Sequence, residues 1–232
     1  MYVPPFIHTH VRQDNVTSMC ASLSGDNLVT CGRDRTVRAW NITANSHGIY
    51  RPGAVGGSGD AVACVDKKVI VEGGDDGAIR LWEMGRKKPT AVEKNAHDGN
   101  WIVSVGTARA REGDCVLTGS WDGKIKVWRA GGRESKTPGL ELVSEIPVTG
   151  YVNSISVCSS GRMAVVAVGR EHRLGRWDVV KGGAKLDRVG FVELYPKGAA
   201  GVTEFDDNMN EVGEDESESE SESESDEDSD AS

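Results

Sequence analysis

The segment CGRDRTVRAW at residues 31–40 is followed by three segments of the same design: EGGDDGAIRLW at 72–82, GSWDGKIKVW at 119–128 and VGREHRLGRW at 168–177. Each ends on a tryptophan, with spacings of 42, 46 and 49 residues: Trp40, Trp82, Trp128 and Trp177. An acidic residue stands six positions before each tryptophan, and an aliphatic residue stands three positions before it. Alternating apolar and polar residues indicate a half-buried strand, and the Gly and Asp residues before it indicate a tight turn.

Further strands are predicted around these segments. Upstream of each tryptophan the chain reads VTSMCAS, AVACVD, IVSVGTA and VNSISV, and downstream of the last three it reads KPTAVEK, LELVSEI and RVGFVEL. A period of roughly 40 to 45 residues with four short strands per unit is typical of a β-propeller blade. The sequence therefore predicts an all-β fold with four propeller blades within residues 1–203.

Charge divides the chain into two unlike parts. The body, residues 1–203, has 27 basic and 21 acidic residues, which gives a net charge of +6, whereas residues 204–232 carry 15 acidic residues and no basic one. The acidic segment has too few apolar residues to offset the entropy cost of ordering, so we expect a disordered tail. Its serines are flanked by acidic residues and are candidate phosphorylation sites: Ser217, Ser219, Ser221, Ser223 and Ser225. The mildly basic body favours a polyanionic partner such as RNA.

The cysteines and the N-terminal sequence narrow the class of protein further. Five cysteines occur without a Cys-x-x-Cys pair or a His/Cys cluster, so neither a disulfide framework nor a metal site is predicted. We expect them to be small buried hydrophobic residues in a reducing compartment. No apolar run is long enough to span a bilayer, and the N-terminus does not read as a secretory signal, so no membrane partner is expected.

These repeats resemble the WD-repeat family. In that family a His, a Ser or Thr, the turn Asp and the strand Trp form a hydrogen-bonded set in each blade, and the resemblance implies two complete sets: His10, Thr30, Asp34 and Trp40; and His97, Thr118, Asp122 and Trp128. The second repeat has Glu72 in place of the hydroxyl residue, and the fourth has Ala167 there and Glu171 in place of the Asp.

The fourth repeat is more specific. The string Glu171-His172-Arg173-Leu174-Gly175-Arg176-Trp177 resembles the last blade of the U3 small nucleolar ribonucleoprotein WD proteins, the ribosomal RNA processing protein nine family. Other segments resemble that family in the same order, from about His10 to Leu194. Members have about seven blades and a charged N-terminal extension, whereas the match here begins near the fourth blade. We therefore expect these four blades to be part of a seven-bladed ring, and we favour a truncated or alternative start at Met1. The alternatives are a ring completed by another chain and a closed four-bladed ring, which would need different angles between blades.

The resemblance implies a non-catalytic RNA- and protein-binding scaffold in the nucleolus of the nucleus. It would bind the U3 small nucleolar RNA beside box C/D core proteins, including the small kink-turn-binding protein. With other proteins of the small-subunit processome it would act in pre-rRNA processing and small-subunit ribosome biogenesis. The alternative is a WD-repeat protein-protein adaptor of another nuclear complex.

Arginines and aromatic residues near the turns suit phosphate contact and base stacking. The candidate RNA-binding residues are Arg33, Arg35, Arg170, His172, Arg173, Arg176, Trp101 and Trp121. The alternative for each arginine is a solvated turn in which it pairs with a neighbouring acid. A separate set of cations, each two positions before its tryptophan, is predicted to be structural and to face solvent: Arg38, Arg80 and Lys126.

No catalytic constellation emerges from the sequence. Asp75 and Asp76 are adjacent carboxylates, but they occupy the repeat turn, and neither a Gly-rich phosphate loop nor an activated serine is found. We therefore expect no enzyme activity, no cofactor and no small-molecule substrate.

Overall fold

The structure, a computed structural model, describes residues 14–22, 24–53, 56–109, 114–131, 139–173, 175–180 and 187–194, with the side chains of 176–178 excluded. Several predictions from the sequence fall outside this part of the chain: His10, the side chain of Arg176, the tail from residue 204 and its serines Ser217, Ser219, Ser221, Ser223 and Ser225.

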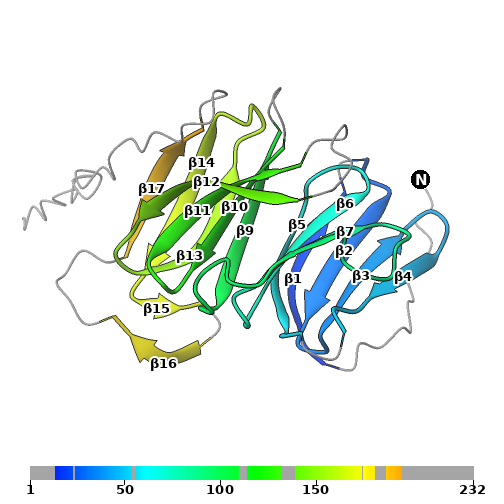
Figure 1. Ribbon diagram of the computed structural model, residues 1–232, viewed down its shortest axis with the longest axis horizontal. Helices are drawn as coiled ribbons and strands as arrows, with labels where there is room; N and C mark the ends of the chain where they lie inside the picture. Colours follow the sequence, from blue (N-terminus) through cyan, green and yellow to red (C-terminus); the bar gives the residue numbers. More distant parts are fainter. Residues whose placement is uncertain are drawn as a thin grey trace, which may run out of the picture.

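The described residues form antiparallel sheets that follow one another along the chain, which confirms the predicted all-β fold (Figure 1). The first sheet contains β1 (Val16–Ala21), β2 (Asn27–Gly32), β3 (Thr36–Asn41) and β4 (Ser46–Tyr50). The second contains β5 (Gly59–Cys64), β6 (Val69–Gly74), β7 (Ile79–Glu83) and β8 (Ala91–Glu93). The third contains β9 (Ile102–Ala108), β10 (Cys115–Ser120), β11 (Lys124–Ala130) and β12 (Leu140–Pro147). In each of these three sheets the strands pair in sequence order, as blades one, two and three.

Blade four departs from the predicted order. Its sheet joins β13 (Tyr151–Val157), β14 (Met163–Gly169) and β17 (Arg188–Glu193), while β15 (Glu171–His172) and β16 (Gly175–Val179) form a separate two-stranded hairpin. Figure 1 shows this hairpin apart from β14 and β17. The prediction that the segment ending at Trp177 is the third strand of the blade is therefore wrong.

Strand β17 takes the place beside β14 that was predicted for the segment ending at Trp177. Strand β14 buries Ala164, Val166 and Val168, and its partner has to extend this apolar layer. Strand β17 does so with Val192, which is 1% exposed within the same core cluster. The sequence GRWDV of β16 also alternates between apolar and polar residues, so this alternation by itself does not select the partner of β14.

The core lies between blades. One cluster joins blades one and two, a second joins blades two and three, and a third joins blades three and four. The innermost strands β1, β5, β9 and β13 are neighbours in that order. Each blade between two others is thus covered on both faces.

The turns between the second and third strands share one backbone requirement. Arg35, Gly77 and Gly123 follow the turn Asp of blades one to three, and all three have positive φ values of 55°, 70° and 73°. A Cβ at Gly77 would lie 2.6 Å from the carbonyl carbon of Gly99, and one at Gly123 would lie 2.6 Å from the carbonyl oxygen of Val148. Glycine is therefore needed at both positions for conformation and for space.

The three cations that precede the tryptophans are structural, but the prediction that they face solvent is wrong. Arg38, Arg80 and Lys126 are all buried. Arg38 donates to the carboxylate of Asp34 over 3.1 Å, and Arg80 pairs with Asp76 in the same way. Lys126 pairs with Glu145 on the next strand over 2.9 Å. These contacts tie each strand to its turn or to its neighbour.

The cysteines are only partly as predicted. Cys31 and Cys64 are buried, Cys20 and Cys115 are half-buried, and Cys158 is exposed. Cys158 follows the end of β13 and lies in a turn, so the strand pattern does not extend to it.

The described residues contain neither a candidate membrane-spanning helix nor a candidate metal site. No helix there is long and apolar enough to cross a membrane. Within the same residues, no group of three or more His, Cys, Asp and Glu side chains is arranged to hold a metal ion.

Candidate functional site: buried hydrogen-bond sets, a central hairpin and a basic edge

Blade three contains a continuous chain of buried hydrogen bonds. The Nδ1 atom of His97 lies 2.9 Å from the carboxylate of Asp122, and its Nε2 atom lies 2.7 Å from Oγ1 of Thr118. The indole N–H of Trp128 donates to the same Thr118 oxygen over 2.9 Å. With the His97 proton on Nδ1, His97 donates to Asp122 and accepts from the hydroxyl of Thr118, and that hydroxyl accepts from Trp128. Each donor in the set then has an acceptor. The set links the turn, the second strand and the third strand of the blade.

We expect Thr118→Val to lower the free energy of unfolding by about 2 to 4 kcal/mol, because it leaves the buried Trp128 N–H and a His97 nitrogen without partners. Urea denaturation would measure the loss. The matched control is Thr30→Val in blade one, where Thr30 accepts the N–H of the half-buried Trp40 over 2.9 Å. The loss of unfolding free energy in Thr30→Val should be smaller than in Thr118→Val. Equal losses would contradict a cooperative set in blade three.

In blade two a carboxyl group accepts the hydrogen bond of the strand tryptophan. The N–H of Trp82 donates to Oε2 of Glu72 over 2.8 Å, so Glu72 replaces the hydroxyl acceptor of blades one and three. Glu72 is fully buried, and burial raises its pKa to about 7, with Arg80 and Trp82 opposing the rise. Its ordinary value of 4.5 is the reference for the unfolded chain. The carboxyl group of Glu72 is thus held partly in its neutral form near physiological pH.

The raised pKa of Glu72 makes stability depend on pH. The contribution is fully present below pH 4.5 and is lost as the pH rises through about 7, because the folded state holds the proton more tightly. Glu72→Gln keeps an acceptor for Trp82 but cannot ionise. We expect the variant to gain about 3 kcal/mol over the native chain between pH 4.5 and pH 8.

Urea denaturation at several pH values measures this gain, with Glu141→Gln at an exposed position as the control. Parallel stability curves for the native chain and the Glu72 variant would disprove the raised pKa.

An aromatic cluster lies where blades three and four meet the hairpin. The ring of Trp101 lies 4.5 Å from that of His172 and 6.0 Å from that of Trp121, measured between centroids. Tyr151 lies 6.2 Å from Trp121 and 6.1 Å from His172. Three of the predicted RNA-binding residues are therefore brought together. His172 is buried, and both tryptophans are half-buried, so these rings are not freely exposed stacking surfaces.

The cluster is held by polar contacts at its edges. The N–H of Trp101 donates to the carboxylate of Asp60 in β5, and the N–H of Trp121 donates to Asn100 over 2.9 Å. Burial raises the pKa of Asp60 to about 6, and the nearby Asp75 adds to the rise. Burial and the adjacent Arg173 lower the pKa of His172 to about 4, so its ring is neutral at physiological pH. These buried groups position the hairpin.

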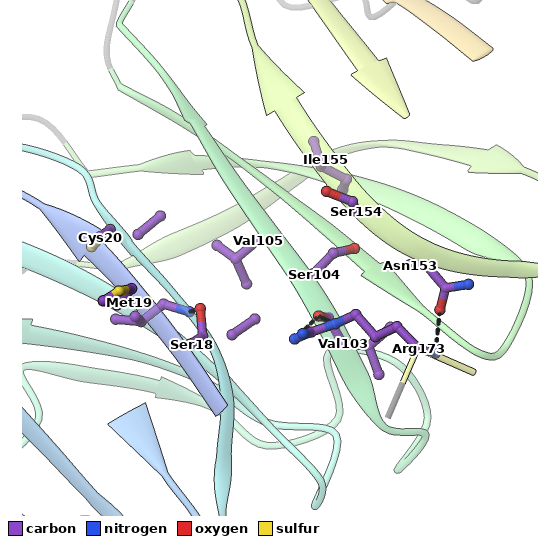
Figure 2. A pocket seen from close by; sticks show the side chains of 13 residues that line it. Ser18, Met19, Cys20, Val103, Ser104, Val105, Asn153, Ser154, Ile155 and Arg173 are labelled. Carbon is purple, nitrogen blue, oxygen red and sulfur yellow. Dashed lines mark hydrogen bonds between the residues drawn. The ribbon is translucent and has the colours of Figure 1, made fainter. Parts of the chain in front are cut away.

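Arg173 anchors the hairpin at the centre of the row of blades. Its Nη2 atom donates to the carbonyl oxygens of Asp60 over 2.8 Å and of Val103 over 2.9 Å, and its backbone N–H donates to Asn153 over 2.9 Å. Figure 2 shows Arg173 at one side of a cavity of about 400 Å³ lined by the innermost strands of all four blades. The side chain of Arg173 thus joins blades two and three, and its backbone N–H adds a contact with blade four.

The remaining predicted arginines do not join this cluster. Arg33 and Arg35 are exposed in the β2–β3 turn of blade one. Arg170 is exposed and pairs with Asp187, with Nε 3.1 Å from the carboxylate. Arg170 therefore has the acidic partner that the alternative interpretation expected.

A group of cations that was not among the predicted site residues lies on blade two, at the end opposite the β6–β7 turn. We call it the basic edge, and it consists of Lys67, Lys68, Arg86, Lys87 and Lys88. All five are exposed. The β5–β6 and β7–β8 turns carry them at the same end of an antiparallel sheet, and the N–H of Met84 donates to the carbonyl of Lys68 over 2.8 Å.

Among the described residues, the basic edge forms one ion pair, between Arg86 and Glu83. Arg86 pairs with Glu83 over 2.8 Å in an exposed contact, which salt screens strongly. The signal that could have found this group was the run Gly85-Arg86-Lys87-Lys88 combined with the topology, since alternating turns bring Lys67 and Lys68 to the same end.

Comparison with known proteins places the blades in a family. The WD domain, G-beta repeat model matches residues 5–41 and 89–129. A rice protein, U3 snoRNP-associated protein-like YAOH of Oryza sativa subsp. japonica, is 31% identical over 196 residues, which cover 73% of this chain and 37% of the relative. The human U3 small nucleolar RNA-interacting protein 2 is 36% identical over 134 residues, which cover 54% of this chain and 27% of the relative.

A solved structure agrees with these relatives. The structure of U3-55K matches with a TM-score of 0.68 and 32% identity, over 79% of this chain and 56% of that one. The chain spans about a third of the length of the two curated relatives described above. From the repeated strands, the hydrogen-bond set of blade three and these matches, the chain is a WD40-repeat protein and a homologue of the U3 snoRNP-associated WD proteins.

Proposed function

We propose that this chain is a non-catalytic scaffold of the U3 small nucleolar ribonucleoprotein that acts in pre-rRNA processing in the nucleolus. The observation that carries the proposal is the similarity of the WD body to relatives named for the U3 particle or its RNA, in a plant and in human. The positive charge of the body, +6 from 27 basic and 21 acidic residues, supports a polyanionic partner.

The RNA contact in this proposal is made mainly by the basic edge. Its five cations are exposed and lie on two adjacent turns, and within the described part of the chain one of them, Arg86, forms an ion pair with an acidic side chain. Lysine and arginine side chains in such a setting bind phosphates and release counterions, which gives affinity without sequence reading. Arg33 and Arg35 provide a second, smaller exposed site at the opposite end of blade one.

The protein contacts are assigned to the side of the hairpin. The arginine and the aromatic rings there are already engaged within the chain, so they present a fixed shape and not free phosphate-binding groups. Box C/D core proteins, among them the small kink-turn-binding protein, and other small-subunit processome proteins are the proposed partners on this side.

Immunoprecipitation followed by sequencing of the bound RNA tests the proposal. The full chain is expected to enrich U3 RNA strongly over other small nucleolar RNAs of the same class. Recovery of the box C/D core proteins without U3 enrichment would overturn the assignment.

A protein-protein adaptor of another nuclear complex is the second candidate. The engagement of Arg173 by two backbone carbonyls and of Arg170 by Asp187 favours it, because these side chains are less available to phosphates. The two candidates differ in salt dependence: RNA binding through phosphates weakens steeply between about 50 and 200 mM salt, whereas an adaptor shows no such RNA binding.

A further inference from the structure

Two cysteine side chains from different blades meet at the inner edge of the row. Cys20 lies in β1 and Cys64 in β5, and their sulfur atoms are 3.4 Å apart although the residues are 44 positions apart in sequence. The two strands are held side by side by polar contacts of their own: Thr17 donates to the carbonyl of Gly59, and the N–H of Val62 donates to Ser18. The proximity of the thiols is thus set by the packing of two blades.

The two thiols differ in their exposure and in their pKa values. Cys20 is half-buried and lines the central cavity, where Figure 2 shows its side chain beside Met19 and Ser18, whereas Cys64 is packed in the core cluster behind it. The hydrogen bond between the two thiols raises the pKa of Cys20 and lowers the pKa of Cys64. The sulfur that lines the cavity is thus Cys20, whereas the thiolate, which is the reactive form, is favoured on the buried Cys64. An oxidant that reacts with either sulfur leaves the other 3.4 Å away.

We propose that Cys20 and Cys64 form a redox-sensitive pair that closes to a disulfide when hydrogen peroxide enters the central cavity, joining blade one covalently to blade two. One thiolate attacks a peroxide oxygen, the O–O bond breaks, and a sulfenic acid and hydroxide form. The second thiolate then attacks the sulfenic sulfur and expels hydroxide. The two thiol protons convert the two hydroxides to water, so two thiols and one peroxide give one disulfide and two waters.

The required movement is small. The sulfur atoms have to approach from 3.4 Å to roughly 2.05 Å, which side-chain rotation and a slight closing of β1 on β5 can supply. Cys31 is the competing partner, because it lies in β2 of the same blade as Cys20 and interacts with it electrostatically. The test therefore has to identify both sulfurs of the bond.

The experiment uses the full chain with Cys158→Ser, because the exposed Cys158 has a pKa lowered to about 7, mainly by the hydroxyl of Ser160, and would react first. The chain is treated with a small molar excess of hydrogen peroxide, blocked with iodoacetamide and digested without reduction. Mass spectrometry should find residues 13–33 linked to residues 39–67, and this product should disappear after reduction with dithiothreitol.

Three variants assign the bond. Cys31→Ser should retain the linked peptides, whereas Cys20→Ser and Cys64→Ala should each abolish them. The full chain that carries only Cys158→Ser gives the primary result. A folding defect in one of the three further variants therefore does not remove the test. Failure of the linked peptides to form while Cys20 or Cys64 is oxidised to sulfinic acid would overturn the proposal. So would a link that survives in Cys20→Ser, or one whose yield rises with protein concentration as an intermolecular bond would.

Discussion

Replacing the five cations of the basic edge by glutamate is expected to lower the affinity of the chain for U3 RNA by at least about 100-fold at low salt. Each phosphate contact contributes to affinity through counterion release, and glutamate adds repulsion where a cation stood. If three of the five cations contact phosphates, the slope of log affinity against log salt should also decrease by about 2. Fluorescence anisotropy with a labelled U3 RNA fragment, titrated between about 50 and 200 mM salt, measures both quantities.

The matched control reverses the charge of Arg33 and Arg35, which are exposed at the opposite end of blade one. This change should reduce affinity by no more than about tenfold, because it removes fewer phosphate contacts. All the altered residues are exposed, so thermal melting should be similar in both variants and in the native chain. A larger loss in the control than in the basic-edge variant would place the RNA contact at the other end of the blades.

Trp82→Ala is expected to lower the free energy of unfolding by about 4 to 5 kcal/mol. Trp82 is fully buried between blades one and two, where its ring meets the edge of Tyr50 and its N–H satisfies Glu72. The alanine variant leaves both a cavity and a buried carboxyl group without its donor. A loss of this size is a large part of the roughly 5 to 15 kcal/mol that stabilises a domain.

Trp40→Ala is the control for this change, since Trp40 occupies the same place in blade one but is only half-buried. Guanidinium denaturation should give it less than half of the loss found for Trp82. Equal losses would show that the tryptophans act through a local strand contact and not through the packing of adjacent blades.

The strands that pair with their sequence neighbours were predictable, because alternation and turn residues are local signals. The pairing in blade four was not. Periodicity shows that Gly175–Val179 and Arg188–Glu193 are both strands, but the choice between them as partners of β14 depends on which strand buries apolar surface against blade three. That choice is made by residues distant in sequence, Val192 among them.

The orientation of Arg38, Arg80 and Lys126 was misjudged for a related reason. In a sheet with one wet face, a charged residue between two apolar ones points to solvent. Here blades two and three are packed between other blades and have no wet face. In blades one to three an acidic residue of the cation's own blade pairs with the buried cation: Asp34, Asp76 or Glu145. The turn Asp was expected as a hydrogen-bond acceptor, but its cationic partner four positions later was not.

The candidate site shows the same division between local and distant information. Trp101, Trp121 and His172 were predicted as RNA-binding candidates from their places in the repeats, whereas their packing into one partly buried cluster is seen in the structure. The engagement of Arg173 by Asp60 and Val103 depends on a hairpin reaching two other blades, and the basic edge depends on two turns meeting. Glu72 was visible as a substitution, but only the structure gives it the role of acceptor for Trp82.

Ultraviolet cross-linking of the full chain to U3 RNA, followed by mass spectrometry of the RNA-linked peptides, tests the proposed RNA scaffold most directly. The basic edge predicts that the linked peptides contain the β5–β6 turn around Lys67 and Lys68 and the β7–β8 turn around Arg86 to Lys88. Cross-links confined to the β2–β3 turn of blade one or to the β15–β16 hairpin, or the absence of any U3-dependent cross-link, would contradict it.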